Sequence, residues 1–410
     1  MNTSWKTCRL GDVCHVIPGY AFKSSDWQDS GIPVVKIKNI RDDNSVDLSE
    51  TDCVSESLLS QKLQKFVLKN GDILVAMTGA TAGKVGKVRT DRPILLNQRV
   101  AKISPVEADH QFIWAIVSSE EYQQKFFQLA DGAAQPNMSG GQIESVEIPF
   151  PPLPVQRRIA SILSAYDELI ENSQRRIRIL ETMTRALYRE WFVHFRFPGH
   201  ETHPRVPSPL GNIPQGWEVK SIQKFGAVIT GKTPSKANAD LFGNDVPFVK
   251  TPDMHGNIFI LGTSDSLSTA GAESQSNKTL PAGSICVSCI GTIGVVSITT
   301  EDCQTNQQIN SVVLANPASR EFLFHRLQDA KQTLKNLGAN GATMGNVNKG
   351  KFEAMEIVSP SNELLSRYHR LVEPMFSEIL SVLRQTQTLR RTRDLLIPRL
   401  LSGQVNLPIN

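Results

Sequence analysis

The most regular feature of the chain is a ladder of apolar side chains between residues 159 and 191, spaced alternately four and three residues apart. A second ladder with the same spacing lies 209 residues later, between residues 368 and 400, and Arg, Glu and Gln fill the positions between the rungs. A stripe that repeats every 3.5 residues is typical of a helix that pairs with another helix in a coiled coil. The two ladders therefore predict two long helices that pair with each other in an antiparallel coiled coil. The predicted pairing residues are Ile159, Leu163, Tyr166, Ile170, Ile177, Leu180, Leu187, Val372, Met375, Ile379, Val382, Leu389 and Leu396.

Helix breakers delimit these ladders. The alternative to pairing is that each helix packs only on its own domain, but long, narrow stripes favour a partner helix. The proline-rich run at residues 148–154 predicts a stiff connector before the first helix. Pro374 predicts a kink in the second helix, or its effective start, and Pro398 predicts its end. Ser361 or Asn362 is expected to cap it.

The segments that precede the ladders have a different pattern. Short β-like runs recur at residues 33–40, 72–79 and 100–104, and again at 246–251, 284–289 and 309–315. Helical stretches follow at residues 112–130 and 320–338. We therefore predict an α+β protein with two globular domains, each followed by a long helix.

The two halves are collinear repeats. Trp5 and Gly71 match Trp217 and Gly283 at an offset of 212 residues, and Asn97 and Gly132 match Asn306 and Gly341 at an offset of 209. Features that recur in the same order indicate an internal duplication, which predicts a pseudo-two-fold arrangement. The predicted divisions are a first domain at 1–152, a central helix at 153–197, a linker at 198–216, a second domain at 217–360 and a C-terminal helix at 361–410.

Composition narrows the function only slightly. A net charge of +4 and a pI near 8.7 are compatible with a nucleic-acid partner without requiring one. No apolar run approaches the ~20 residues that span a bilayer, and the first residues lack a signal-peptide layout, so we expect a cytoplasmic protein. Cys286 and Cys289 have metal-like spacing, but they lie in a predicted strand that would turn them to opposite faces, and no metal site is predicted.

One stretch matches a phosphate-binding motif. Residues 226–233, GAVITGKT, fit the G-x-x-x-x-G-K-[ST] pattern of a P-loop. A P-loop requires a buried strand before it and a helix after it, whereas this match follows a polar segment and precedes a proline-containing loop. In the other repeat the aligned residues 19–22 are GYAF, without the lysine or the hydroxyl. The match therefore predicts a turn at the start of the second domain, where Lys232 meets solvent or a DNA phosphate.

Several longer motifs together are more specific. Residues 148–183, which begin IPFPPLPVQRRIASIL, residues 186–195, ALYREWFVHF, and residues 395–403, LLIPRLLSG, recur in the order domain, helix, domain, helix. With residues 231–254, which begin GKTPSKANADLFG, they make the whole chain resemble the specificity subunit of type I restriction–modification systems.

The resemblance implies a non-catalytic subunit. Its two target recognition domains would each read one half of a split DNA site, and its helices would hold them apart and scaffold two methyltransferase subunits. S-adenosylmethionine, ATP and Mg would be bound by partner subunits, which include restriction subunits, and not by this chain. Helices of about 35 residues span roughly 50 Å, or about 15 base-pair steps, which suits separated half-sites. Because the two domains differ in sequence, we expect different half-sites.

Residues that contact DNA are predicted by type and position alone. Lys, Arg, Asn, Gln and Thr in loops and at strand ends are the side chains that reach phosphates and base edges. The repeated pairs Asn97–Gln98 and Asn306–Gln307 are instead expected to be structural, because domains that read different bases should not share their base-reading residues. The candidates are Lys23, Lys36, Lys38, Arg41, Thr78, Lys84, Lys87 and Arg99 in the first domain, and Lys232, Lys236, Lys250, Thr251 and Asn257 in the second.

Two other classes of function stay open at this level. One is an enzyme, either a P-loop nucleotidase or a fused methyltransferase, and the other is a protein–protein adaptor whose domains have lost DNA binding. The recognised bases and the spacer length are not encoded in any pattern that we can read.

Overall fold

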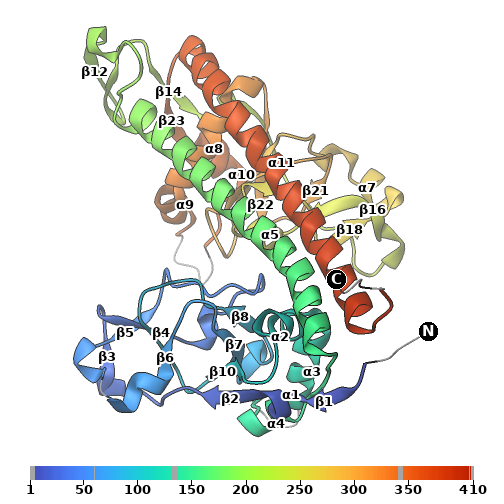
Figure 1. Ribbon diagram of the computed structural model, residues 1–410. Coiled ribbons are helices and arrows are strands. Elements are labelled where there is room, and N and C mark those ends of the chain that lie inside the picture. Colours follow the sequence, from blue (N-terminus) through green and yellow to red (C-terminus); the bar gives the residue numbers. More distant parts are fainter. Residues whose placement is uncertain (1–4, 60, 131–135, 340–344, 406, 408–410) are drawn as a thin grey trace. The chain divides into compact units, whose positions relative to one another are not determined.

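The computed structural model describes residues 5–59, 61–130, 136–339, 345–405 and 407 (Figure 1). Gly132 and Gly341, the last matched pair of the repeat, lie outside these residues. Contacts divide the chain into unit 1, Met1–Asn172 with Gln387–Asn410, and unit 2, Ser173–Thr386. These divisions differ from the sequential ones because the boundary between the units passes through both long helices.

Unit 1 contains a four-stranded antiparallel sheet in the order β2-β10-β7-β8. A second sheet has the order β3-β5-β4-β9-β6, and its strands are interspersed along the chain with those of the first sheet. In this second sheet, β4 and β9 pair in parallel. The bounds are β2 Cys14–Pro18, β3 Trp27–Gln28, β4 Ile32–Val35, β5 Asp52–Val54, β6 Val67–Leu68, β7 Ile73–Ala76, β8 Val85–Lys87, β9 Ile94–Leu96 and β10 Val100–Pro105. Helices α2 (His110–Val117), α3 (Glu120–Ala130) and α4 (Gly140–Glu144) follow, and β1 (Thr7–Arg9) pairs with β11 (Glu147–Pro149).

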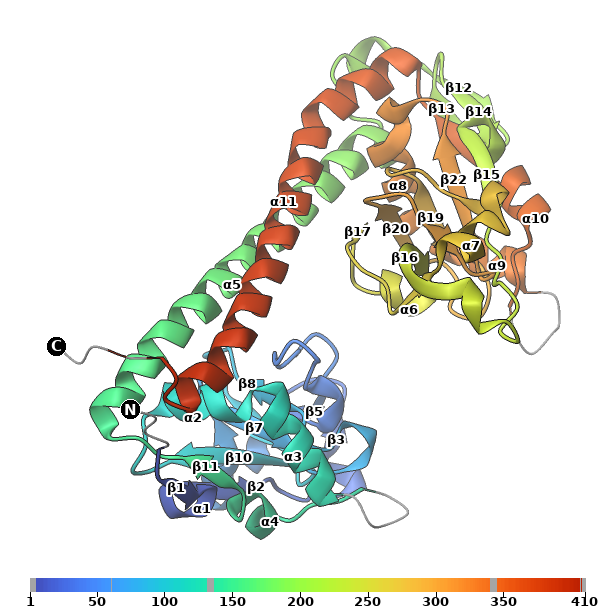
Figure 2. The ribbon, with the colours of Figure 1, turned by 90° about the vertical axis from the view of Figure 1, so that its right-hand side faces the viewer.

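Unit 2 repeats this topology (Figure 2). Its main sheet has the order β15-β22-β19-β20-β17, and β16 and β21 pair in parallel as β4 and β9 do. The bounds are β14 Glu218–Ser221, β15 Gly226–Thr230, β16 Phe242–Val249, β17 Phe259–Ile260, β18 Asp265–Leu267, β19 Ile285–Ser288, β20 Val296–Thr299, β21 Gln304–Thr305, β22 Ile309–Leu314 and β23 Glu356–Ser359. The shorter helices are α6 Thr251–Met254, α7 Thr269–Glu273, α8 Arg320–Asp329, α9 Lys331–Gly338 and α10 Lys349–Ala354. The predicted duplication and the α+β class are therefore confirmed.

The long helices are α5, Leu153–Tyr188, which continues as a π-helical turn through Val193, and α11, Asn362–Leu401. Within unit 1, Ile159 and Leu163 share a core with Ile397 and Leu400, and within unit 2, Ile177 shares a core with the 372–382 part of α11. The partners run in opposite directions, so the predicted antiparallel pairing is confirmed in each unit. All thirteen predicted pairing residues are buried or half-buried.

The proline predictions need correction. Helix α11 begins at Asn362, twelve residues before Pro374, and continues past Pro398 to Leu401. Both prolines lie on the exposed face, where the carbonyl that loses its partner can bond to water, and packing on the other face offsets the helix-breaking cost of about 3 kcal/mol. The hydroxyl of Ser361 accepts from the Leu364 N–H at 3.3 Å, as expected for a cap.

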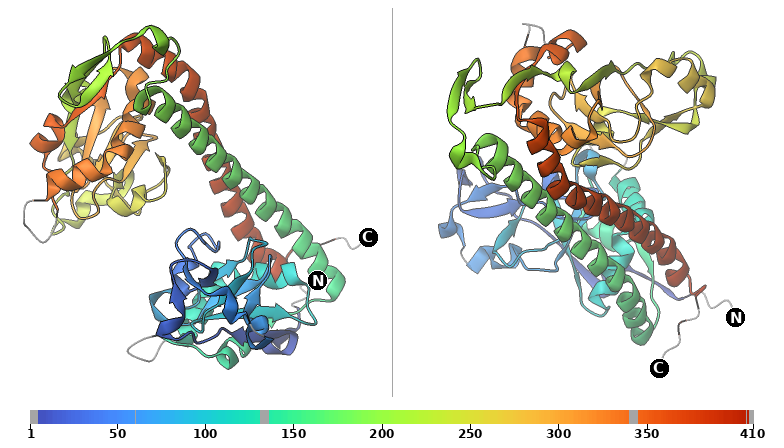
Figure 3. Two further views of the ribbon diagram at one scale, coloured as in Figure 1. Left: turned by 90° about the vertical axis from the view of Figure 1, so that its left-hand side faces the viewer. Right: turned by 90° about the horizontal axis from the view of Figure 1, so that it is seen from above.

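The predicted linker also contains regular structure. Strands β12 (Arg205–Ser208) and β13 (Gly211–Pro214) form a hairpin beside the C-terminal end of α5 (Figure 3). Ile213 in β13 is buried with Trp217 in the core of unit 2. The prolines and glycines of this segment predict only a loop. They give no sign of the two paired strands or of the buried apolar side chain of Ile213.

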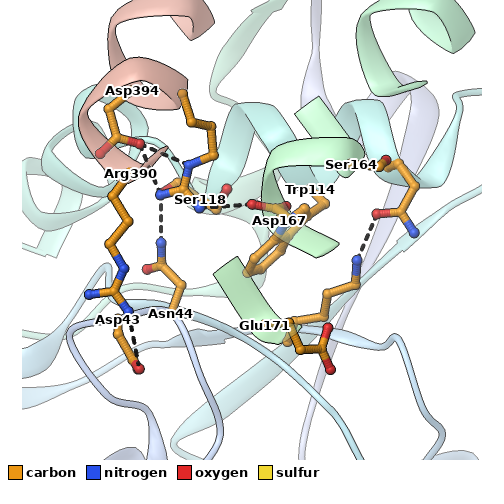
Figure 4. A network of polar contacts seen from close by, with 12 residues as sticks. Asp43, Asn44, Trp114, Ser118, Ser164, Asp167, Glu171, Arg390 and Asp394 are labelled. Atoms are coloured by element: carbon orange, nitrogen blue, oxygen red, sulfur yellow. Dashed lines mark hydrogen bonds and ion pairs between the residues drawn. The ribbon is translucent and has the colours of Figure 1, made fainter. Parts of the chain in front are cut away.

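In unit 1, the recognition domain is attached to the long helices by a polar chain (Figure 4). Asp167 of α5 accepts hydrogen bonds from the Trp114 indole N–H and from Arg393 of α11, both at 2.8 Å. Arg390 of α11 reaches Asp43 at 3.8 Å.

Candidate nucleic-acid interface

A short turn between β9 and β10 has the same hydrogen bonds as the turn between β21 and β22. In unit 1, the Asn97 side-chain oxygen accepts from the Arg99 N–H at 3.2 Å, and in unit 2 Asn306 accepts from Gln308 at 3.1 Å. The Asn97 N–H donates to the Val35 carbonyl and the Asn306 N–H to that of Val249, both at 3.1 Å. Asn97 and Asn306 are buried. The repeated asparagine is therefore a structural element of the turn, as expected.

A glycine packs closely against each of these turns at the same place. Gly19 and Gly231 donate to the first residue of β10 and β22, at 3.0 and 3.1 Å. A β-carbon on Gly19 would lie 2.3 Å from the Asn97 carbonyl oxygen, and one on Gly231 would lie 2.1 Å from that of Asn306. No side chain fits there, which explains why glycine stands at both positions. The second glycine of the P-loop match therefore serves close backbone packing.

The loop after the central strand of each main sheet completes the arrangement. The Met77 N–H donates to the Arg99 carbonyl at 2.9 Å, and the Cys289 N–H donates to that of Gln308 at 2.7 Å. Gly79 and Gly291 then donate to residues 136 and 345, at 2.9 and 3.3 Å. We call these segments the duplicated turn cluster: residues 19–20, 77–79, 97–99 and 136–137 in unit 1, and residues 231–232, 289–291, 306–308 and 345–346 in unit 2.

The side chains on this shared framework differ between the units. Tyr20 corresponds to Lys232, Thr78 to Ile290 and Arg99 to Gln308. Arg99 and Lys232 are exposed and form no ion pair with any described residue. Gln98 and Gln307 are the same in both, and Gln307 accepts from the Thr233 hydroxyl at 2.6 Å. The cluster thus presents a shared turn backbone with side chains that differ in chemistry.

Lys36 and Lys250, two of the predicted residues, occupy matching positions in the two units. Lys36 and Lys38 both contact Asp52 at 3.0 Å, and Lys250 pairs with Asp265. Hydrogen bonds from Lys36 and then Lys38 lower the pKa of Asp52. Asp52 lies in β5 and Asp265 in the matching strand β18, so Lys36 and Lys250 play one structural part in both domains. We therefore do not assign base discrimination to them.

The structure places the other predicted residues in several environments. Arg41 pairs with Asp47 at 2.6 Å, and Lys84 pairs with Asp42. Lys87 is buried, donates to Gln111 at 2.6 Å, and has its pKa lowered to about 8 by burial.

Thr251 is also buried, and like Lys87 it is better assigned to the fold than to DNA. Lys23, Lys236 and Asn257 are exposed. Thr78, Arg99 and Lys232 are the predicted residues that the fold gathers in the duplicated turn cluster. Gln308 was not predicted, although its alignment with Arg99 could have identified it.

The remaining sequence motifs have structural roles. Residues Gly226–Thr230 of the P-loop match form strand β15 and not a phosphate-binding loop. Cys286 and Cys289 are buried in two different core clusters, as their positions on a strand predicted. In the part of the chain that the structure describes, no three His, Cys, Asp or Glu residues could hold a metal ion, and no helix is long and apolar enough to cross a membrane.

Comparisons with known proteins agree with this architecture. The family model for the type I restriction modification DNA specificity domain matches residues 2–182 and 214–364, one match for each repeat. The chain is 32% identical over 354 residues to the type I restriction enzyme HindI specificity subunit of Haemophilus influenzae, covering 72% of this chain and 77% of that protein. It is 22% identical to the MjaIX specificity subunit of Methanocaldococcus jannaschii, covering 98% of this chain and 94% of the relative.

A solved structure has a similar fold. The crystal structure of the type I restriction–modification system S subunit from M. genitalium aligns over 99% of this chain and 98% of its own, with a TM-score of 0.59 at 14% identity. Together with the two domain matches and the duplicated fold, these similarities show that the chain belongs to the family of type I restriction–modification specificity subunits.

Proposed function

We propose that this chain is the non-catalytic DNA-recognition subunit of a type I restriction–modification complex. Each recognition domain reads one half of a split, asymmetric site, and the paired helices scaffold two methyltransferase subunits and carry the association with restriction subunits. S-adenosylmethionine, ATP and Mg belong to those partners, and the complex works in the cytoplasm.

The duplicated turn cluster is the single observation that best supports this function. Eight hydrogen bonds of the cluster recur in both units with different outward side chains on them. A shared backbone that carries different side chains at three matched positions suits domains that share one docking mode and read different bases.

The proposal is tested by sequencing the methylated bases of a host genome with and without this gene. We expect one split motif with two different halves, present only with the gene. DNA binding by the complex should also fall steeply with salt, because phosphate contacts release counterions. A genome without any gene-dependent split motif, although the chain still recruits methyltransferase, would favour the adaptor; tight binding of ATP by the isolated chain would favour the nucleotidase.

A further inference from the structure

The duplication supplies an internal control for locating base-reading residues. A residue that the two domains share cannot distinguish their half-sites, whereas a residue that differs on an identical backbone can. At one position of the duplicated turn cluster the backbone hydrogen bonds match in both units, so a difference in side chain there is a difference in chemistry presented at the same place. The position that follows the shared Asn-Gln pair is Arg99 in unit 1 and Gln308 in unit 2.

The backbone holds this position firmly in both units. The Arg99 N–H is bonded to the Asn97 side chain and its carbonyl to Met77, and Gln308 has the same two partners in Asn306 and Cys289. Both peptide groups are therefore fixed, and only the side chain is free to vary. A side chain that reads a base must be positioned in this way, since its hydrogen bonds discriminate only when its register on DNA is set.

The side chains themselves are suited to two different bases. Arg99 is exposed and forms no ion pair with the residues that the structure describes, so its five donors are available. The Gln308 side-chain oxygen accepts from the Asn306 amide at 3.2 Å, which leaves a second lone pair and the Gln308 amide hydrogens for a ligand. Arginine pairs with the O6 and N7 acceptors of guanine, and glutamine pairs with N6 and N7 of adenine.

We infer that Arg99 and Gln308 are equivalent base-reading residues, and that Arg99 selects a guanine in one half-site while Gln308 selects an adenine in the other. This assignment rests on the proposed function and adds the bases read at one position of each half. The shared Gln98 and Gln307 and the ion-paired Lys36 and Lys250 hold or dock the domain and do not discriminate.

The experiment exchanges the two side chains in the complete complex with its methyltransferase subunits. Arg99→Gln should change one position of the first half-site from guanine to adenine, by about tenfold or more in relative methylation, and leave the second half unchanged. Gln308→Arg should make the opposite change in the second half only. Arg92→Gln is the matched control, because it removes an exposed arginine of the same domain that forms no ion pair with a described residue and lies outside the cluster.

The outcomes separate the inference from the proposed function. A wild-type complex without a split motif overturns both. A wild-type motif that Arg99→Gln and Gln308→Arg leave unchanged overturns only the inference. A loss of binding that is uniform over all sequences, with a salt slope smaller by about one, would identify Arg99 as a phosphate contact and overturn its role in base reading.

Discussion

The two recognition domains share one topology but are attached to the long helices by opposite chemistry. In unit 1, Asp167 links Trp114 to Arg393 by two hydrogen bonds. The residue that corresponds to Asp167 in unit 2 is Phe376, whose ring packs edge-on against Phe324 with centroids 5.6 Å apart. Phe324 lies in α8, which follows β22 along the chain as α2, the helix of Trp114, follows β10. A duplicated fold has therefore kept the position of the contact and replaced a polar link with an aromatic one.

Further rings surround the attachment of unit 2. Phe192 packs on Tyr368 with centroids 4.8 Å apart, and the Tyr368 hydroxyl donates to the Thr184 carbonyl at 3.4 Å. Ile159, the counterpart of Tyr368 in unit 1, is aliphatic, and so is Leu401, the counterpart of Phe192. The two units therefore pack their long helices at matching positions, and the fold accepts either polar or aromatic contacts there.

Removing a ring from the aromatic attachment of unit 2 should have the largest effect on stability. Phe376→Ala removes a fully buried ring and should lower the free energy of unfolding of unit 2 by about 4 kcal/mol, because it leaves a cavity among Phe324, Phe259 and His325. Hydrogen exchange resolved by unit would measure it. Equal loss of protection in units 1 and 2 would mean that the attachments do not stabilise their units separately.

A smaller effect is expected from the polar attachment. Among the described residues, Asp167→Ala leaves the half-buried Arg393 with Asp394 as its one ion-pair partner and removes the acceptor of the Trp114 N–H. This loss should cost unit 1 roughly 3 kcal/mol.

The double variant Asp167→Ala with Arg393→Met tests the reason for this loss. It removes the unpaired charge, so part of the lost stability should return. If the double variant is as unstable as Asp167→Ala, the ion pair is not the source of the effect.

The third difference depends on pH. Burial lowers the pKa of His325 in unit 2 to about 4, whereas the buried residues of α2, the matching helix of unit 1, include no histidine. The unfolded chain binds a proton below pH 6.5 and the folded unit does not, so the free energy of unfolding of unit 2 falls as pH drops from 6.5 towards 4. The loss should be about 2 kcal/mol by pH 5.

A variant without the titrating group isolates this contribution. His325→Gln should flatten the decline over that pH range, measured by the same unit-resolved exchange. An unchanged slope in this variant would assign the acid sensitivity to other groups.

The fold was largely predictable because its strongest signals are periodic. The 3.5-residue ladder identified both helices and their seam, but it could not reveal the second face of each helix. Tyr188, Phe192 and Phe376 lie outside the ladder and pack on the recognition domain of unit 2. The competing interpretation, that each helix packs only on its own domain, is therefore wrong, because Tyr188 and Phe192 of α5 pack on the domain of unit 2.

The candidate interface was less predictable. Whether a lysine is available to DNA depends on acidic partners that lie in other strands, such as Asp52 for Lys36 and Asp265 for Lys250. Those ion pairs form only when β5 pairs with β4 and β18 pairs with β16, and no local sequence pattern encodes these pairings. The alignment of the repeats locates the shared Asn-Gln turn and pairs Arg99 with Gln308, and the matched hydrogen bonds show that both residues have the same backbone partners.

The division of the chain into units has a consequence for its synthesis. Unit 2 is one continuous stretch, whereas the core of unit 1 includes Ile397, Leu400 and Leu401, which leave the ribosome after the whole of unit 2. The first recognition domain to be started is thus completed after the second. Until residues 397–401 have been made, its apolar helix-binding surface lacks a partner, so termination between residues 386 and 397 would release a chain in which the second domain is whole and the first is not.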